Sequence, residues 1–354
     1  MKKQFFLATL VAMATVFVAQ KMSAQENQSK PLDKATKNAV IASLLTQMDD
    51  KYIFPETAKA AALKIKEYQK KGVYNTITDP GEFTRLLTEQ YRDIIKDKHL
   101  SVWYNPNQKP KDGPKDEAVE KEREARFLRH MGRQNFGLPK LDILEGNVGY
   151  LKIDGFGPVD KVGETVTGAM MYLANTEALI IDLRDNGGGE PDLVRYVASY
   201  FFGDEPVHIN DLYYRKGNET TEYWTIPVHG KKYIGKPVYV LISGRTFSGG
   251  EELAYDLQTQ KRATLVGETT GGGANPGDMA DLGNGFFAFI PDGRAINPIT
   301  KTNWEGVGVK PDVAVPAADA LKKAHTMALE ELLETATDDM SRDFYKKGLE
   351  AIQQ

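Results

Sequence analysis

One serine in this 354-residue chain lies where a nucleophile could act. Ser248 lies in the segment GRTFSGGE, between an apolar run that predicts a buried strand, Lys236–Ser243, and a predicted helix over Gly249–Thr259. A serine in this position is raised to the rim of a sheet, where the positive end of the helix favours the alkoxide formed on attack. Ser248 and Glu251 also fit the S-x-x-E capping box, which is far commoner than a catalytic serine. The sequence therefore allows a nucleophile or a helix cap here.

A second predicted junction between a strand and a helix carries three consecutive glycines. The apolar run Ala178–Leu183 is followed by Asp185-Asn186 and Gly187–Gly189, and a helix is predicted over Pro191–Phe202. Backbone N–H groups of such a loop can converge on an anion, either a phosphate or the oxyanion of an acyl transition state. The loop matches neither G-x-G-x-x-G nor a Walker loop, which weakens the phosphate interpretation. A plain glycine turn remains the structural alternative.

Four segments of the chain, in the same order, resemble the C-terminal processing (tail-specific) serine peptidases. The closer similarity is to the branch that includes the tricorn protease core and bacterial relatives of the interphotoreceptor retinoid-binding protein. The resemblance covers about residues 146–316 and implies an α/β fold with a crotonase-like (ClpP/crotonase) core, preceded by a small three-helix domain. It also implies peptide hydrolysis. The segments are ALIIDLRDNGGG, VYVLISGRTFSGGEELAYDLQ, ATLVGETTGGGANPG and NWEGVGVKPDVAVP.

The resemblance implies roles for five residues. Ser248 matches the nucleophile, His99 the general base, and Glu305 the carboxylate that completes the catalytic set. The backbone N–H groups of Gly249 and Gly188 match the oxyanion hole. Serine needs a base that takes its proton, and histidine, with an ordinary pKa of about 6.5, can do this and return the proton to the leaving amine. Taken alone, His99 could be a packed histidine and Glu305 a surface carboxylate.

Two positions depart from the pattern of the family. The serine–lysine members carry a lysine base at the position of Gly273, and no lysine lies between Lys261 and Lys301 in this chain. We therefore assign the chain to the histidine-dependent branch. Tricorn has a serine directly before its histidine as part of the catalytic set, whereas this chain has Lys98. The polar stretch at 105–146 is too short for the regulatory PDZ domain that is usual in the family.

The elements that must position these residues fall into an all-helical part and an α/β part. Helical spacing, with Asp33 as a cap and proline and glycine at the expected ends, predicts three helices within 31–98. A short strand, Leu100–Tyr104, follows them. Strands then alternate with helices, which predicts an α/β catalytic core. We expect a helical domain over 26–100, a polar linker or insert over 101–145, the core over 146–316, and two C-terminal helices over 317–354.

The first 25 residues have the pattern of an export signal. Lys2 and Lys3 precede the apolar run Phe5–Ala19, and the small residues Ser23 and Ala24 follow. The apolar run is shorter than the roughly 18 residues that a spanning helix needs, although an uncleaved anchor is the alternative. We therefore expect a bacterial protein that is exported to the periplasm or secreted, without a membrane span after processing.

The amino-acid composition excludes several classes of partner and cofactor. The formal net charge is −4, so a basic surface that binds nucleic acid is not expected. Cysteine is absent, which excludes thiol chemistry, disulfides and zinc sites with cysteine ligands. The five histidines lack H-x-x-x-H spacing. We predict a peptide or protein substrate, no cofactor and no metal, and the sequence is compatible with a homo-oligomer.

The sequence thus predicts an exported serine-type endopeptidase that works through an acyl-enzyme. One alternative is a non-catalytic protein that binds peptides or lipids on the same fold. Another is a serine esterase that uses the same residues. Four aromatic residues could line a substrate cleft, although aromatic residues in strands more often serve packing. They are Tyr213, Tyr214, Tyr223 and Trp224.

Overall fold

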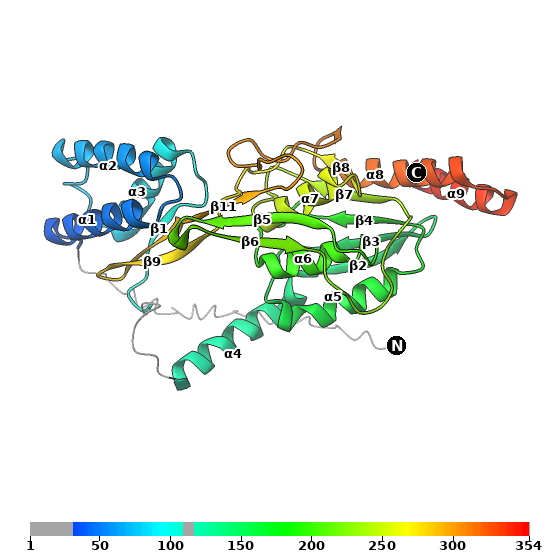
Figure 1. Ribbon diagram of the computed structural model, residues 1–354, viewed down its shortest axis with the longest axis horizontal. Coiled ribbons are helices and arrows are strands. Elements are labelled where there is room, and N and C mark those ends of the chain that lie inside the picture. Colours follow the sequence, from blue (N-terminus) through cyan, green and yellow to red (C-terminus); the bar gives the residue numbers. More distant parts are fainter. Residues whose placement is uncertain (1–30, 109–116, 354) are drawn as a thin grey trace, which may run out of the picture.

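A six-stranded sheet forms the centre of the computed structural model, which describes residues 31–108 and 117–353 (Figure 1). The strand order is β12-β8-β7-β4-β3-β2, in which β2 runs antiparallel to β3 and the other neighbours run parallel. Because β4 and β7 are parallel neighbours, the two loops that follow them lie side by side at one edge of the sheet. The bounds are Lys140–Leu144 for β2, Val148–Lys152 for β3, Ala178–Asp182 for β4, Val238–Ile242 for β7, Thr264–Gly267 for β8 and Val313–Ala314 for β12.

Helices cover both faces of this sheet. Side chains from α5, α6 and α7 form one core with alternate residues of the strands, and α8 forms another core with the remaining ones. Burial on both faces explains why β4 and β7 are continuous apolar runs, as the sequence indicates. The bounds are Val159–Leu173 for α5, Pro191–Ser199 for α6, Gly249–Thr259 for α7, Ala320–Thr335 for α8 and Asp339–Gln353 for α9, which packs on α8.

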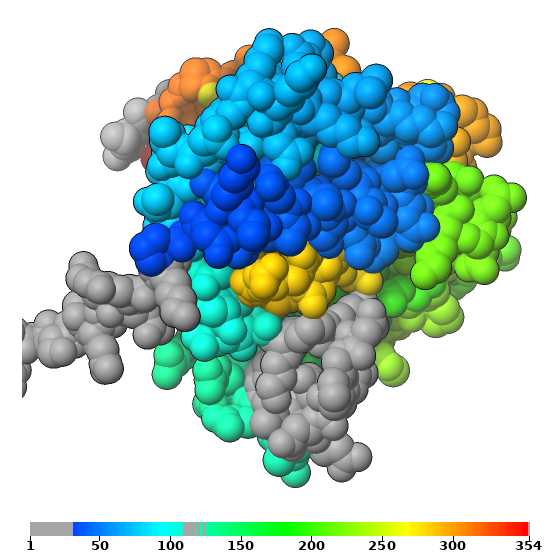
Figure 2. Space-filling model, turned by 90° about the vertical axis from the view of Figure 1, so that its left-hand side faces the viewer, coloured from blue at the N-terminus to red at the C-terminus, as the bar shows by residue number. Residues whose placement is uncertain are grey.

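The three predicted N-terminal helices share their core with a second, antiparallel sheet. This sheet has the order β1-β10-β9, and α1 lies on β9 and β10 (Figures 1 and 2). Phe83 of α3 contacts Phe286 of β10 edge to face, with ring centroids 5.9 Å apart. The helices therefore have no separate core of their own, because strands from much later in the chain complete it. The bounds are Lys34–Lys51 for α1, Pro55–Lys70 for α2, Pro80–Ile95 for α3, Ser101–Tyr104 for β1, Gly277–Gly283 for β9 and Phe286–Pro291 for β10.

The third sheet has the order β11-β5-β6 and contains strands that the sequence analysis does not assign. Its strand β6 is almost entirely exposed, so no buried pattern marks it in the sequence. Helix α5 and strands β2 and β9 are also unassigned there. The bounds are His208–Tyr214 for β5, Glu219–Trp224 for β6 and Gly293–Ile296 for β11, with short 3₁₀ turns at Asn135–Gly137 and Lys216–Asn218.

Two sequence predictions concern segments at the limits of the described chain. Among its described residues, the polar insert expected over 101–145 contains the helix α4 (Glu117–Arg133) together with the strands β1 and β2. The expected export signal at 1–25 lies outside the described residues, as do residues 109–116 of the insert. Within the part of the chain that the structure describes, we find no helix with the length and apolar character that a membrane crossing needs.

Candidate active site

Hydrogen bonds tie together the two loops that follow β4 and β7. The N–H of Phe247 donates to the carbonyl oxygen of Asn186 at 2.9 Å. The Arg245 guanidinium donates to Oδ1 of Asp185 at 2.5 Å, and Lys152 contacts the other oxygen at 2.8 Å. These bonds to Lys152 and Arg245 lower the pKa of the Asp185 carboxyl. The serine-containing loop and the glycine loop thus form one unit at the edge of the sheet.

Ser248 has a strained backbone conformation directly before α7. Its φ of 52° and ψ of −121° lie outside the regions that residues with a side chain normally occupy. The N–H of Ser248 donates to Oε2 of Glu251 at 2.9 Å. The fully buried Glu251 carboxylate also accepts bonds from the Thr270 hydroxyl and from the N–H groups of Gly272 and Gly273. Glu251 therefore caps α7, as the S-x-x-E pattern predicts, and at the same time joins Ser248 to the loop at 270–273.

Three backbone N–H groups of the glycine loop and the start of α7, those of Gly188, Gly189 and Gly249, are candidates for an oxyanion hole. The N–H of Gly188 donates to Oδ1 of Asn186 at 2.8 Å, so it is already engaged. The N–H groups of Gly249 and Gly189 have no acceptor among the described residues. A Cβ added to Gly188 would lie 2.6 Å from Cβ of Ser248, so only glycine permits this close approach. The geometry thus offers Gly189 beside Gly249 as a free donor, where the sequence analysis selected Gly188.

The end of α3 brings His99 to the same place. Lys96 ends the helix in the left-handed conformation with φ 60°, and Oδ1 of Asp97 then accepts the N–H of His99 at 3.0 Å. The His99 ring packs on Phe247 with a centroid distance of 4.6 Å. His99 and Ser248 both line one cavity of about 450 Å³, which we call the Ser248 cavity. Within the described residues, no hydrogen bond joins the Ser248 hydroxyl to the imidazole.

Two carboxyl groups lie beside the His99 ring. One nitrogen of His99 and one oxygen each of Asp97 and Glu305 lie within 4.8 Å of one another. Nδ1 of His99 and Oε1 of Glu305 are buried without a hydrogen-bond partner among the described residues, whereas Oε2 of Glu305 accepts the N–H of Ala274 at 2.6 Å. Burial lowers the pKa of His99. Burial, together with the charge of Asp97, raises the pKa of Glu305 to about 8. At pH 7 the imidazole is therefore neutral and Glu305 holds a proton.

Asp97 is a site residue that the sequence analysis does not single out. Its buried Oδ2 accepts bonds from Nδ2 of Asn275 at 2.9 Å and from the Tyr52 hydroxyl at 3.3 Å. A carboxylate two residues before a candidate base is visible in the sequence, but its approach to Glu305 is not. Asp97, His99 and Glu305 together have the donor atoms that a divalent cation binds, so a chelator must test the predicted absence of a metal.

Gly273 and Lys98, the two positions that depart from the family pattern, each make close contacts in the structure. A Cβ added to Gly273 would lie 2.3 Å from Cζ of Phe247 and 2.7 Å from Cε1 of His99. The two rings thus occupy the space that a longer side chain at 273 would need. Nζ of Lys98 donates to the carbonyl oxygen of Gly271 at 2.6 Å, so Lys98 ties the end of α3 to this loop.

The four aromatic residues that could line a substrate cleft have different surroundings in the structure. Tyr214 lines the Ser248 cavity together with Leu212 of the same strand. The Trp224 ring instead stacks on His208 at a centroid distance of 4.4 Å, and Tyr223 packs against the core beneath the sheet. Tyr214 packs against the same core as well, and Tyr213 packs against the core of the N-terminal helices, so Tyr214 alone of the four lines the cavity and it also serves packing.

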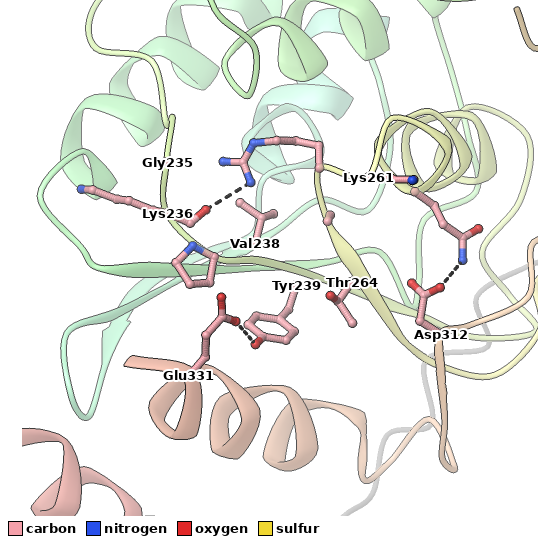
Figure 3. A pocket seen from close by; sticks show the side chains of 12 residues that line it. Gly235, Lys236, Val238, Tyr239, Lys261, Thr264, Asp312 and Glu331 are labelled. Atoms are coloured by element: carbon pink, nitrogen blue, oxygen red, sulfur yellow. Dashed lines mark hydrogen bonds between the residues drawn. The ribbon is translucent and has the colours of Figure 1, made fainter. Parts of the chain in front are cut away.

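A second cavity of about 520 Å³ shares no lining residue with the first (Figure 3). We call it the Arg262 cavity. Arg262 donates to three backbone carbonyl groups, and the Tyr239 hydroxyl donates to Glu331 at 2.6 Å. Nε2 of Gln258 donates to Asp312 at 2.8 Å. None of the residues that the sequence analysis selected for catalysis lines this cavity.

Comparisons with known proteins agree on one family. The profile described as peptidase family S41 matches residues 147–315, and the profile described as the N-terminal domain of peptidase S41 in eukaryotic IRBP matches residues 32–129. The chain is 26% identical over 190 residues to carboxyl-terminal-processing peptidase 1, chloroplastic, of Arabidopsis thaliana, a match that covers 53% of this chain and 38% of the relative. It is 26% identical over 176 residues to the carboxy-terminal processing protease CtpB of Bacillus subtilis (strain 168), covering 49% and 35%.

The fold has counterparts among solved structures. A crystal structure from Parabacteroides merdae ATCC 43184 superposes with a TM-score of 0.55 at 20% identity, over 86% of this chain and 98% of the other. This likeness is one of fold and establishes a mixed α/β architecture. The matched region spans less than half the length of the curated relatives.

Proposed function

This chain belongs to peptidase family S41, and from that premise we propose that it is a serine-type endopeptidase that hydrolyses peptide bonds through an acyl-enzyme. In this proposal residues 146–316 form a crotonase-like core, Ser248 is the nucleophile and His99 is the general base. One observation carries the proposal: Ser248, on a strained turn, shares a cavity with the His99 imidazole and lies beside free backbone N–H groups. We further propose that the protein is exported to the periplasm or secreted.

The proposed reaction uses the groups of the Ser248 cavity in two steps. Oγ of Ser248 attacks the peptide carbonyl carbon while the neutral ring of His99 accepts the hydroxyl proton. The oxyanion that forms accepts hydrogen bonds from the N–H groups of Gly249 and Gly189, each of which contributes roughly 10²–10³ in rate. His99 then donates its proton to the leaving amine, the C–N bond breaks, and water hydrolyses the acyl-enzyme by the same path.

Glu305 is the proposed carboxylate partner of the imidazolium. Its unpartnered Oε1 and the unpartnered Nδ1 of His99 are both buried, so each lacks the bond that the other could supply. A positive charge on the ring favours ionisation of Glu305, whose pKa is raised to about 8 in the resting protein. Asp97 adds a second negative group and fixes the backbone of His99. Gly188 can serve as a donor only if its bond to Asn186 breaks.

Labelling and turnover experiments separate this proposal from its alternatives. A fluorophosphonate should label the wild-type protein at Ser248 and should not label Ser248→Ala. A non-catalytic protein that binds peptides or lipids would show no label. Turnover of a diverse peptide pool, followed by mass spectrometry, then distinguishes a peptidase from an esterase, which would hydrolyse small acyl esters only. Activity that EDTA abolishes would point to a metal at Asp97, His99 and Glu305.

A further inference from the structure

The Ser248 cavity contains a carboxyl group that the proposed reaction does not use. Glu252 lies one helical turn after Ser248, and its N–H donates to the carbonyl oxygen of Ser248 at 2.9 Å. Residues four apart lie on the same face of a helix, so this side chain follows Ser248 along one face of α7. Glu252 is 6% exposed and lines the cavity. A carboxyl group is therefore buried directly next to the proposed nucleophile.

The neighbouring strand β5 holds this carboxyl in place. Nδ2 of the fully buried Asn210 donates to Oε1 of Glu252 at 3.0 Å. Leu212 and Tyr214 follow at alternate positions of the same strand and line the cavity as well. Oε2 of Glu252 accepts no hydrogen bond from the residues that the structure describes. One oxygen is thus fixed and the other is available. We call Leu212, Tyr214 and Glu252 the acidic wall.

Further carboxyl groups surround the acidic wall. Burial raises the pKa of Glu252 to about 7 and also raises the pKa of Asp256, so a cation that enters here stabilises their ionised forms. Glu190 lines the cavity at an exposed position, and Asp256 is fully buried one turn beyond Glu252 on α7. Of the described residues that line the cavity, none is lysine or arginine. Burial raises the pKa of the Tyr214 hydroxyl, and the charges of Asp292, Glu252 and Glu190 raise it further. A cationic group that enters the cavity would therefore find a carboxylate to pair with and no lysine or arginine side chain in the described lining to repel it.

We propose that the acidic wall selects substrates with lysine at the residue that supplies the scissile carbonyl group. This inference rests on the proposed peptidase function. An ammonium group is a compact charge that one free carboxylate oxygen can hold, whereas arginine pairs best with two oxygens. Asn210 occupies the other oxygen, so lysine is favoured over arginine. An apolar side chain would leave Oε2 of Glu252 buried without a partner, which has a cost in free energy.

A set of peptides that differ only at this residue tests the inference. Lysine, arginine, norleucine and glutamate are compared in the wild type, Glu252→Gln and an exposed control on α8, Glu330→Gln. We expect the wild type to prefer lysine. Glu252→Gln keeps an acceptor for Asn210, and the ratio of kcat/KM for lysine to that for norleucine should fall about 10- to 100-fold in it. The ratio should stay unchanged in Glu330→Gln and should change by about threefold or less in Glu190→Gln.

Three outcomes separate the inference from the function on which it rests. If cleavage depends on Ser248 but norleucine is preferred, or if Glu252→Gln leaves the ratio unchanged, the inference is overturned and the peptidase function stands. If no peptide is cleaved in a manner that depends on Ser248, both fail. A test on the wild type alone avoids any folding defect of the variants: n-butylammonium should slow fluorophosphonate labelling of Ser248 more than n-butanol does. Equal protection by the two compounds would overturn the inference.

Discussion

The Ser248 cavity and the Arg262 cavity have similar volumes, about 450 Å³ and 520 Å³, but their polar groups differ in kind. In the Arg262 cavity, Arg262, Tyr239 and Gln258 all donate to acceptors within the protein. In and around the Ser248 cavity, His99 Nδ1 and Glu305 Oε1 are buried without partners in the described structure. A buried polar atom without a partner reduces stability, so proteins rarely keep one without a use. Of these two cavities of similar volume, the Ser248 cavity is the one with buried hydrogen-bonding atoms that lack partners beside a candidate nucleophile.

The largest effect expected from this comparison is the loss of the Ser248 hydroxyl. Ser248→Ala should reduce peptide hydrolysis by about 10⁴-fold or more, because no other group supplies the nucleophile. Ser248→Ala removes the side-chain half of the capping box of α7 but keeps the bond from its backbone N–H to Glu251, so the free energy of unfolding should fall by about 1 kcal/mol at most. Initial rates and thermal unfolding check both statements. Activity that persists in this variant would reject the assignment.

The next effect concerns the space beside His99. In Gly273→Ala the new Cβ would overlap the rings of Phe247 and His99, so the imidazole must move. We expect kcat to fall by about 10²-fold, since small displacements of catalytic groups have large effects. Gly168→Ala is a suitable control, because its Cβ would meet no atom within 4 Å. Equal activities of the two variants would mean that His99 is not the base.

A substitution in the Arg262 cavity should lower the stability of the protein and leave its activity unchanged. Arg262→Met removes the donors of three backbone carbonyl groups, those of Phe201, Tyr233 and Lys236. We expect a loss of about 3 kcal/mol in the free energy of unfolding, because partly buried carbonyl groups lose their partners. Denaturant titration measures this loss, and kcat of the folded fraction should not change. A selective loss of kcat would show that this cavity takes part in catalysis.

The pH dependence of activity tests the charges around the imidazole. Burial lowers the pKa of His99, so activity should fall only when the pH drops below about 6.5. Activity should rise a second time through about pH 8, because ionised Glu305 stabilises the imidazolium better than its protonated form does. Rate profiles of the wild type and Glu305→Gln check this, since the second rise should be absent in the variant. A flat profile from about pH 5 to 8 would contradict a histidine base.

The smallest effect is on stability and again involves Glu305. Its pKa is raised from 4.5 to about 8 in the folded protein, so between these values the folded state binds the proton that the unfolded state has released. The wild type should therefore lose stability as the pH rises through this range. Glu305→Gln should be less sensitive there, and its thermal midpoint should exceed that of the wild type by a few degrees at pH 8. Identical midpoints at pH 8 would mean that Glu305 is not held in a protonated state.

Sequence reasoning works well for elements whose pattern is local. The apolar runs of β4 and β7 and the S-x-x-E motif of α7 each depend on neighbours within a few residues, and each lies where the sequence predicts it. Strands β5 and β6 escape such reasoning because their burial is partial and β6 is exposed. The acidic wall, which β5 helps to build, therefore could not be assembled from the sequence.

The sequence by itself determined that a serine follows one predicted buried strand, that glycines follow another, and that lysine is absent from position 273. Only the tertiary structure decided that Asp97 and Glu305 both approach His99, that the N–H of Gly188 is engaged while that of Gly189 is free, and that Glu252 enters the cavity. The physical reason is that hydrogen-bond partners and burial depend on residues far apart in the chain. A local pattern can name a reactive group, but long-range packing determines its protonation state and its partners.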